Sequence, residues 1–118
     1  MIQDYEDLEV YQKSYKKALE IYEISKALPK DEAYGLTSQM KRAAISISLN
    51  IAEGYGKRRS AAEFKRFLTM AKGSCNEMKV IVDFCRDLEY ISLKAHNELK
   101  ASYDEIGKML NGLINKWQ

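Results

Sequence analysis

The residues most able to do chemistry in this 118-residue chain are the lysines and arginines of its central segment, residues 38–79. That segment contains nine lysines and arginines against three glutamates, although the whole chain has a formal net charge of only +2. The nine are Lys41, Arg42, Lys57, Arg58, Arg59, Lys65, Arg66, Lys72 and Lys79. A nearly neutral protein that gathers its positive charge in one segment is suited to bind a polyanion. We therefore expect RNA or DNA as a partner.

Three of these cations, Lys57, Arg58 and Arg59, stand together directly before Ser60. Ser60 and Glu63 have the spacing of a capping box, so a helix is predicted to begin at Ser60 with reciprocal hydrogen bonds between the two residues. Backbone amides and the helix dipole favour anions at such a helix start, and neighbouring cations would strengthen a phosphate site there. The alternative is a charged turn that serves only solubility.

A second basic pattern, Lys65, Lys72, Lys79 and Arg86, repeats every seven residues on the same predicted helix. Neighbours in this row lie about 10 Å apart along the helix axis. A solvated helix face explains the row as well as a ligand does. Neither pattern is suited to read base edges, so contacts to phosphates with weak sequence preference are expected.

Catalytic and metal-binding patterns are missing from the sequence. His96, the only histidine, falls at the edge of an apolar stripe and is expected to pack. The motifs CxxC, HExxH and Glu-x-x-His do not occur, so no metal, no cofactor and no enzymatic activity are expected. Cys75 and Cys85 lie ten residues apart on one predicted helix, too far to form a disulfide. They are expected to be reduced core residues of a cytoplasmic protein.

Four predicted helices position these residues, because one proline and six glycines leave few breaks in the chain. The predicted ranges are about 6–28, 36–52, 60–88 and 93–117. Pro29 is expected to end the first helix, and Gly54 and Gly56 the second. Short connections favour antiparallel neighbours, so the fold class is all-α, a single up-down-up-down four-helix bundle over residues 1–118. No apolar run approaches the roughly 20 residues that span a membrane, so no membrane partner is expected.

The predicted helices carry more apolar residues than one bundle can bury. The first has a stripe interpreted as core packing and a side row of further apolar residues. The stripe is Leu8, Tyr11, Tyr15, Ala18, Leu19 and Tyr22, and the side row is Val10, Ile21, Ile24 and Leu28. Such surplus apolar surface favours self-association, although loops covering it or simple exposure are alternatives.

The second and third helices show the same surplus. The second has an extra apolar face opposite its main one, with a polar ridge between them, and the third has Met70, Val80 and Phe84 off its main stripe. The residues expected at a subunit interface are Ile21, Ile24, Ile45, Leu49, Asn50, Ala52 and Glu53.

Three blocks of the central segment carry a resemblance to a known family: Ser38-Gln39-Met40-Lys41-Arg42-Ala43-Ala44, Asn50-Ile51-Ala52-Glu53-Gly54 and Ala71-Lys72-Gly73-Ser74. The sequence resembles the 23S rRNA intervening-sequence proteins, which are small bacterial four-helix bundles. One departure is Ser48, where the family pattern usually has proline. Since an interior proline kinks a helix, the second helix is expected to be straighter here.

The resemblance implies assembly as a ring-like homo-oligomer, with a homopentamer as its expected form. The sequence is also similar to the accessory variability proteins of diversity-generating retroelements, which are pentameric barrels that bind nucleic acid and a reverse transcriptase. A reverse transcriptase is therefore a candidate partner. The leading hypothesis is a non-enzymatic, oligomeric nucleic-acid-binding protein, such as an RNA or ribonucleoprotein adaptor. The alternative is an oligomeric protein-interaction scaffold with no nucleic-acid role.

Overall fold

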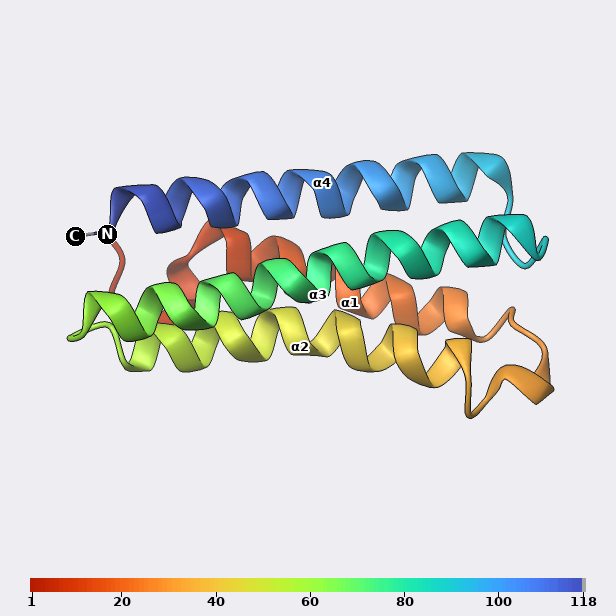
Figure 1. The fold of residues 1–118 in the computed structure, drawn as a ribbon, viewed down its shortest axis with the longest axis horizontal. Coiled ribbons are helices and arrows are strands. Elements are labelled where there is room, and N and C mark those ends of the chain that lie inside the picture. The colour runs from red at the N-terminus through yellow and green to blue at the C-terminus, as the bar shows by residue number, and fades with distance from the viewer. Residues whose placement is uncertain (118) are drawn as a thin grey trace.

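The computed structural model describes residues 1–117, and four long α-helices dominate them (Figure 1). The helices are α1 (Glu9–Ser25), α2 (Leu36–Gly56), α3 (Ala61–Asp87) and α4 (Leu93–Lys116), with short 3-10 turns at η1 (Tyr5–Asp7) and η2 (Lys30–Glu32). Strands are absent from the described residues. The predicted all-α class with four helices is therefore confirmed.

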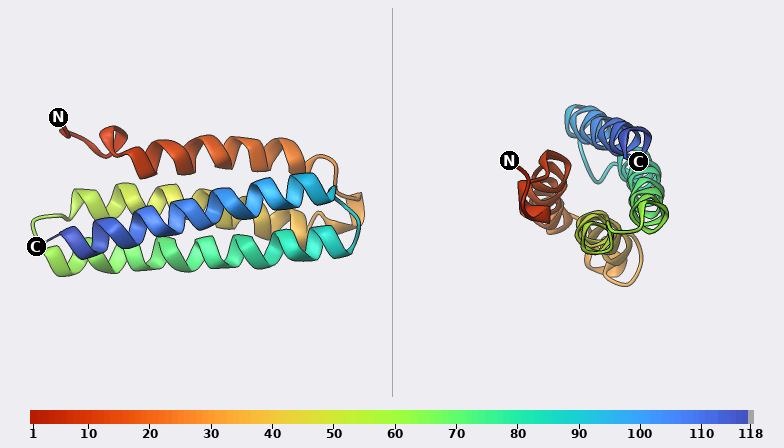
Figure 2. Two further views of the ribbon diagram at one scale, coloured as in Figure 1. Left: turned by 90° about the horizontal axis from the view of Figure 1, so that it is seen from above. Right: turned by 90° about the vertical axis from the view of Figure 1, so that its left-hand side faces the viewer.

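The helices lie along one axis in a molecule of 44 × 24 × 21 Å. In the end-on view of Figure 2 the helices follow one another round the bundle in chain order. Of the four pairs of neighbouring helices, α1 and α4 are in the least contact. A Lys13–Glu105 ion pair links these two helices. The end of α4 lies beside the α2–α3 turn, where the Trp117 and Phe64 rings meet edge to face at 4.7 Å between centroids.

The core is built from apolar residues three or four positions apart, which share one face of a helix. Fully buried examples are Ile47 of α2, Phe64 and Met78 of α3, and Leu110 of α4. Each such side chain contributes about 1.5–3 kcal/mol relative to leaving it in water. Both cysteines lie in this core and are unbridged, as predicted; they are Cys75 and Cys85.

Helix α2 is longer than predicted, because it continues through Gly54 to Gly56. Gly54 does not end the helix but lets α3 come close. A Cβ at this position would lie 2.7 Å from the Cβ of Phe67 and 3.1 Å from Cδ1 of Phe64. The glycine is therefore required by packing between helices, a property that a single-helix pattern does not reveal.

The core face of α1 differs from the predicted one. Val10 and Ile21, assigned to the surplus side row, are buried in the chain's own core, whereas Tyr15 and Leu19 of the expected core stripe are 52% and 56% exposed. The expectation that Ile21 lies at a subunit interface is thus wrong, since its side chain has no exposed surface in the single chain. Ile24 is only partly buried, against the core.

Candidate nucleic-acid interface

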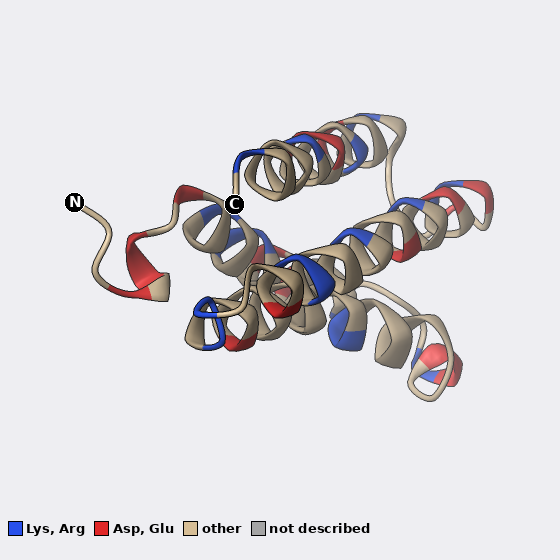
Figure 3. Cartoon of the chain, turned by 60° about the vertical axis from the view of Figure 1, so that its left-hand side comes forward, with Lys and Arg blue, Asp and Glu red and all other residues tan. Residues whose placement is uncertain are grey.

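The α2–α3 turn places Lys57, Arg58 and Arg59 directly before the first turn of α3 (Figure 3). The Ser60 hydroxyl accepts a hydrogen bond from the Glu63 amide at 3.2 Å, which confirms the predicted helix start. The reciprocal half of the capping box is not formed, because the Glu63 carboxylate instead accepts from Arg66 Nε at 2.9 Å. That hydrogen bond lowers the pKa of Glu63.

Aromatic rings hold the cations of this turn in place. Lys57 Nζ lies 4.9 Å from the centroid of the Phe67 ring, and the Arg66 guanidinium lies 4.5 Å from the same centroid. The Arg58 guanidinium lies 4.1 Å from the Tyr55 centroid, and Arg58 Nη1 donates to the Tyr55 carbonyl at 3.0 Å. Exposed cation–π contacts contribute about 0.5–1 kcal/mol each, and both rings are anchored in the core. The turn therefore presents cations with reduced side-chain freedom.

The charges of Lys57, Arg58 and Arg59 are not cancelled by any ion pair within residues 1–117. Arg59 is exposed at the tip of the turn, one residue before the Ser60 cap. We name Lys57, Arg58, Arg59 and Arg66 the basic turn. Fixed cations beside a helix N-terminus are suited to phosphate oxygens.

Two of the predicted cations do not join the basic turn. Lys41 lies about 24 Å back along α2 from Lys57, at 1.5 Å per residue. Its Nζ sits 5.1 Å from the centroid of the Tyr22 ring of α1. Arg42 reaches toward α3, with Nη2 at 4.0 Å from Oε1 of Glu77. The central basic segment is thus divided between two levels of the bundle.

The seven-residue row of α3 faces α4 and is largely engaged there. Lys72 Nζ donates to Asn111 Oδ1 at 2.6 Å, and Lys79 Nζ donates to Asp104 Oδ1 at 2.8 Å. The Lys79 hydrogen bond lowers the pKa of Asp104. Lys65 forms no ion pair within residues 1–117. The row therefore offers a weaker anion surface than Lys57, Arg58 and Arg59, because Asp104 already neutralises Lys79, as Glu63 does Arg66.

A polar cluster at the other end of the α3–α4 pair was not expected from the sequence. His96 is 4% exposed, and its Nε2 lies 2.7 Å from Asp83 Oδ1 and 3.3 Å from Arg86 Nη1. Lys100 Nζ donates to both Asp83 oxygens at 3.0 Å. The hydrogen bond to His96 and then that to Lys100 hold the pKa of Asp83 below its usual range. Residues ten or more apart meet here because the chain reverses at Glu89, whose φ is 64°.

Hydrogen bonds from His96 and Lys100 to Asp83 connect α4 to α3, and burial leaves His96 little access to a ligand. Within residues 1–117, no group of three or more His, Cys, Asp and Glu side chains is arranged to hold a metal ion. None of the helices in that range combines the length and apolar character of a membrane span.

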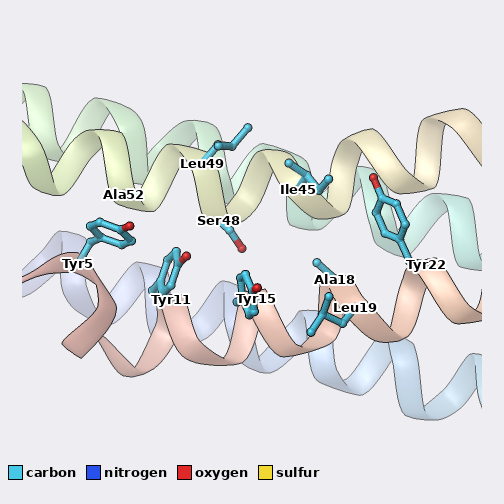
Figure 4. Close-up of a pocket in the computed structure, with 10 residues that line it drawn as sticks. All are labelled: Tyr5, Tyr11, Tyr15, Ala18, Leu19, Tyr22, Ile45, Ser48, Leu49 and Ala52. Atoms are coloured by element: carbon cyan, nitrogen blue, oxygen red, sulfur yellow. The ribbon is translucent and has the colours of Figure 1, made fainter.

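A second exposed surface is an apolar groove of about 490 Å³ between α1 and α2 (Figure 4). We define the α1–α2 groove by Tyr15, Leu19, Tyr22, Ile45 and Leu49, which line it and are exposed. Figure 4 shows Tyr11 and Tyr22 of α1 reaching toward α2.

The hydroxyl of Ser48 lies in the floor of the groove, 2.8 Å from that of Ser14, and Ser14 also donates to the Tyr11 carbonyl at 2.9 Å. Ser48 thus supplies an α1–α2 hydrogen bond that a proline could not. Helix α2 is continuous through this position.

The structure distributes the predicted interface residues over different environments. Ile45 and Leu49 are exposed, Leu49 by 63%, and Ala52 is half-buried beside them. Asn50 Nδ2 donates to the Ser46 carbonyl of its own helix at 2.9 Å, and Glu53 is exposed. A further exposed set on α3, noted in the sequence, is Met70, Val80 and Phe84.

The fold and surfaces together define a small helical bundle with a basic turn at one end and exposed apolar flanks. The family model for the 23S rRNA-intervening sequence protein matches residues 6–112, and the chain therefore belongs to this family. A similar solved structure is the crystal structure of a protein of unknown function from the S23 ribosomal protein family of Bacteroides thetaiotaomicron VPI-5482. It has a TM-score of 0.82 and 27% sequence identity, covering 91% of this chain and 96% of that one. No curated protein matches the sequence.

Proposed function

We propose that this chain is a non-enzymatic, oligomeric nucleic-acid-binding protein that contacts the phosphate backbone with weak sequence preference. The observation that carries the proposal is the basic turn, where Lys57, Arg58 and Arg66 rest on aromatic rings beside the start of α3. Phosphates gain from charge-assisted hydrogen bonds to such fixed donors. The family name, which refers to 23S rRNA, supports RNA as the ligand.

Self-association is the second part of the proposal. An antiparallel up-down-up-down bundle that assembles into a ring, with a pentamer as the expected form, would repeat the basic turn once per subunit. When several basic turns of one assembly contact the same nucleic acid, the overall affinity exceeds that of a single turn. The reason is that every contact after the first forms within an existing complex, at a high effective concentration. The exposed apolar side chains of α1, α2 and α3 support such an assembly. A reverse-transcriptase partner and a cytoplasmic location remain predictions from the sequence.

The test replaces Lys57, Arg58 and Arg59 with glutamine and measures binding by fluorescence anisotropy. Probes are duplex DNA, single strands and structured RNA, from low to physiological salt. Each lost phosphate contact should reduce the log–log salt slope on duplex DNA by about 0.9, so three contacts reduce it by about 3. All probe sequences should be weakened alike, since phosphate contacts carry no base information.

The matched control replaces Lys26, Lys30 and Lys94 with glutamine, which removes the same charge near the opposite end of the helices. This control should keep most of the salt slope. Failure of the wild type to bind any probe at low salt would reject the proposal. If the basic-turn variant binds nucleic acid as well as the wild type does, the basic turn is not the binding site, and Lys65 and Lys72 become the next candidates.

A protein-interaction scaffold is the second candidate, and the α1–α2 groove favours it. Tyr15, Leu19 and Leu49 are all more than half exposed, which is a large apolar surface for a single chain. If no nucleic acid binds while the protein still assembles, the scaffold becomes the better explanation.

A further inference from the structure

Arg66 differs from the other three cations of the basic turn, because a carboxylate of its own helix pairs with it. Glu63 Oε2 accepts from Arg66 Nε at 2.9 Å, and Glu63 Oε1 accepts from Arg66 Nη2 at 3.4 Å. Both carboxylate oxygens therefore lie along one edge of the guanidinium. Arginine binds phosphates through the same paired donors. Glu63 thus occupies the edge of Arg66 that a phosphate would use.

Lys57 also acts on the Glu63 carboxylate, from a greater distance. The hydrogen bond from Arg66 lowers the pKa of Glu63, and the charge of Lys57 contributes in the same direction. Lys57 Nζ and the Arg66 guanidinium lie 4.9 and 4.5 Å from the centroid of the same Phe67 ring. The carboxylate is therefore attracted by two cations that share one aromatic ring. An anion from outside the chain would be attracted to the same place.

The Glu63–Arg66 pair is exposed and opens at little cost. The Arg66 side chain is 54% exposed and that of Glu63 is 42% exposed. Ion pairs of this kind contribute little to stability, because water screens the charges and both side chains lose freedom. Arg66 has further contacts, since its guanidinium lies over Phe67 and its Nη1 is 3.8 Å from Met70 Sδ. When the pair opens, Glu63 is therefore the partner that moves.

We propose that Glu63 is an internal competitor for the phosphate site, and that an incoming phosphate of the nucleic-acid backbone displaces it from Arg66. Arg66 keeps its place over Phe67 and exchanges one bidentate partner for another. Glu63 turns into water, and it lowers the affinity for phosphates because its pair with Arg66 has to break first. This inference rests on the nucleic-acid binding proposed above and names the residue that limits it.

The main test is the double variant Glu63→Gln, Arg66→Gln, which removes one charge of each sign and keeps the net charge. Glutamine is a good helix former and is accepted at the third position of a helix, so circular dichroism should find wild-type helicity. If Arg66 meets a phosphate in the complex, anisotropy should find the log–log salt slope on duplex DNA lowered by about 0.9. Wild-type slope and affinity in this variant would overturn the inference, because Glu63 and Arg66 would then stay paired in the complex.

The matched control is the double variant Glu23→Gln, Lys26→Gln. These residues also form an ion pair three positions apart, with Lys26 Nζ 3.0 Å from Glu23 Oε1. They lie at the end of α1, away from the basic turn (Figure 1). The control should keep the wild-type salt slope. An equal fall in slope here would overturn the inference, since the loss would not depend on the basic turn.

Glu63→Gln alone removes the competitor and keeps Arg66. It should bind duplex DNA and structured RNA about two- to fivefold more tightly than the wild type, which corresponds to an exposed ion pair that no longer has to open. Glu53→Gln should gain less, because Glu53 acts on Arg66 only through its charge and does not pair with it.

The Arg66→Gln background separates displacement from simple loss of negative charge. Glu63→Gln should gain less in that background than in the wild type, because no pair remains to be opened. Equal gains in the two backgrounds would show that charge alone explains the effect and would overturn the inference.

The exchange at Arg66 can also be followed without nucleic acid. The Arg66 Nε–H signal in a ¹H–¹⁵N NMR spectrum, assigned by its loss in Arg66→Gln, should shift when inorganic tripolyphosphate is added. A wild type that shows this shift but binds no DNA or RNA would reject the nucleic-acid proposal and keep the exchange. A wild type that binds nucleic acid while the Arg66 signal stays unchanged would reject the exchange alone.

Discussion

Replacing Gly54 with alanine tests how closely α2 and α3 approach each other near the basic turn. The added Cβ would stand 2.7 Å from the Cβ of Phe67 and 3.1 Å from Cδ1 of Phe64. Carbon atoms in favourable contact are about 3.5–4.0 Å apart. The Cβ of Phe67 is bonded to the backbone and cannot rotate away, so one helix has to move.

Two opposing effects set the size of the change. Alanine favours the helix over glycine by about 1 kcal/mol, whereas overpacking a tight site costs about 1–3 kcal/mol. Because the closest clash is with an atom fixed to the backbone, we place the cost near the upper end of that range. The net loss in the free energy of unfolding is then about 1–2 kcal/mol, which corresponds to a fall in Tm of roughly 4–10 °C in a domain of this size.

Thermal and urea unfolding followed by far-UV circular dichroism measure this loss. All samples are compared at one protein concentration, because self-association would make Tm depend on it. Gly112→Ala is the matched control, since Gly112 lies in α4 and, apart from its chain neighbours and the backbone of α4 itself, its Cβ would meet no atom of residues 1–117 within 4 Å. It should gain about 0.5–1 kcal/mol. If Gly54→Ala gains stability as Gly112→Ala does, the close approach of the two helices is refuted.

Two further predictions concern groups buried in the core. Burial raises the pKa of the Cys75 thiol to about 12 and that of Cys85 to about 11, so neither should react with a thiol reagent at pH 8 before unfolding. Unfolded thiols ionise near pH 8.5. The stability that depends on neutral thiols is therefore complete below that pH and falls as the pH rises toward 11–12. The urea midpoint should drop less over this range in the Cys75→Ala, Cys85→Ala double variant, and an equal drop would contradict the assignment. The hydroxyl of Tyr103 is buried and has no hydrogen-bond partner within residues 1–117, so Tyr103→Phe should be at least as stable as the wild type, and a loss above about 1 kcal/mol would show that the hydroxyl is satisfied.

Local signals in the sequence were sufficient wherever a single helix determines the outcome. Ser60 was predicted as a helix start because its hydroxyl can accept a hydrogen bond from the backbone amide of Glu63, three residues later. This bond forms within one helical turn and requires no contact with the rest of the chain. The two cysteines were predicted as unbridged because helix geometry alone separates them. The four-helix content follows from the scarcity of breaking residues.

The core face of α1 could not be chosen from periodicity. Both candidate stripes keep three- and four-residue spacing, and both contain large apolar side chains. Packing against the other helices buried Val10 and Ile21 and left Tyr15 and Leu19 outside. A helix with two apolar stripes has no local reason to bury one or the other, so the neighbouring helices decide.

The sequence by itself determined the chemistry available at the basic turn, because three consecutive cations before a capping serine are a local pattern. Tertiary structure decided which cations are free to meet a ligand. Lys79 and Arg42 lie near carboxylates from other helices, whereas Lys57 and Arg58 rest on aromatic rings. The physical reason is that a side chain's charge follows from its residue type, but its ion-pair partner comes from a segment distant in the chain and is set only when the helices pack.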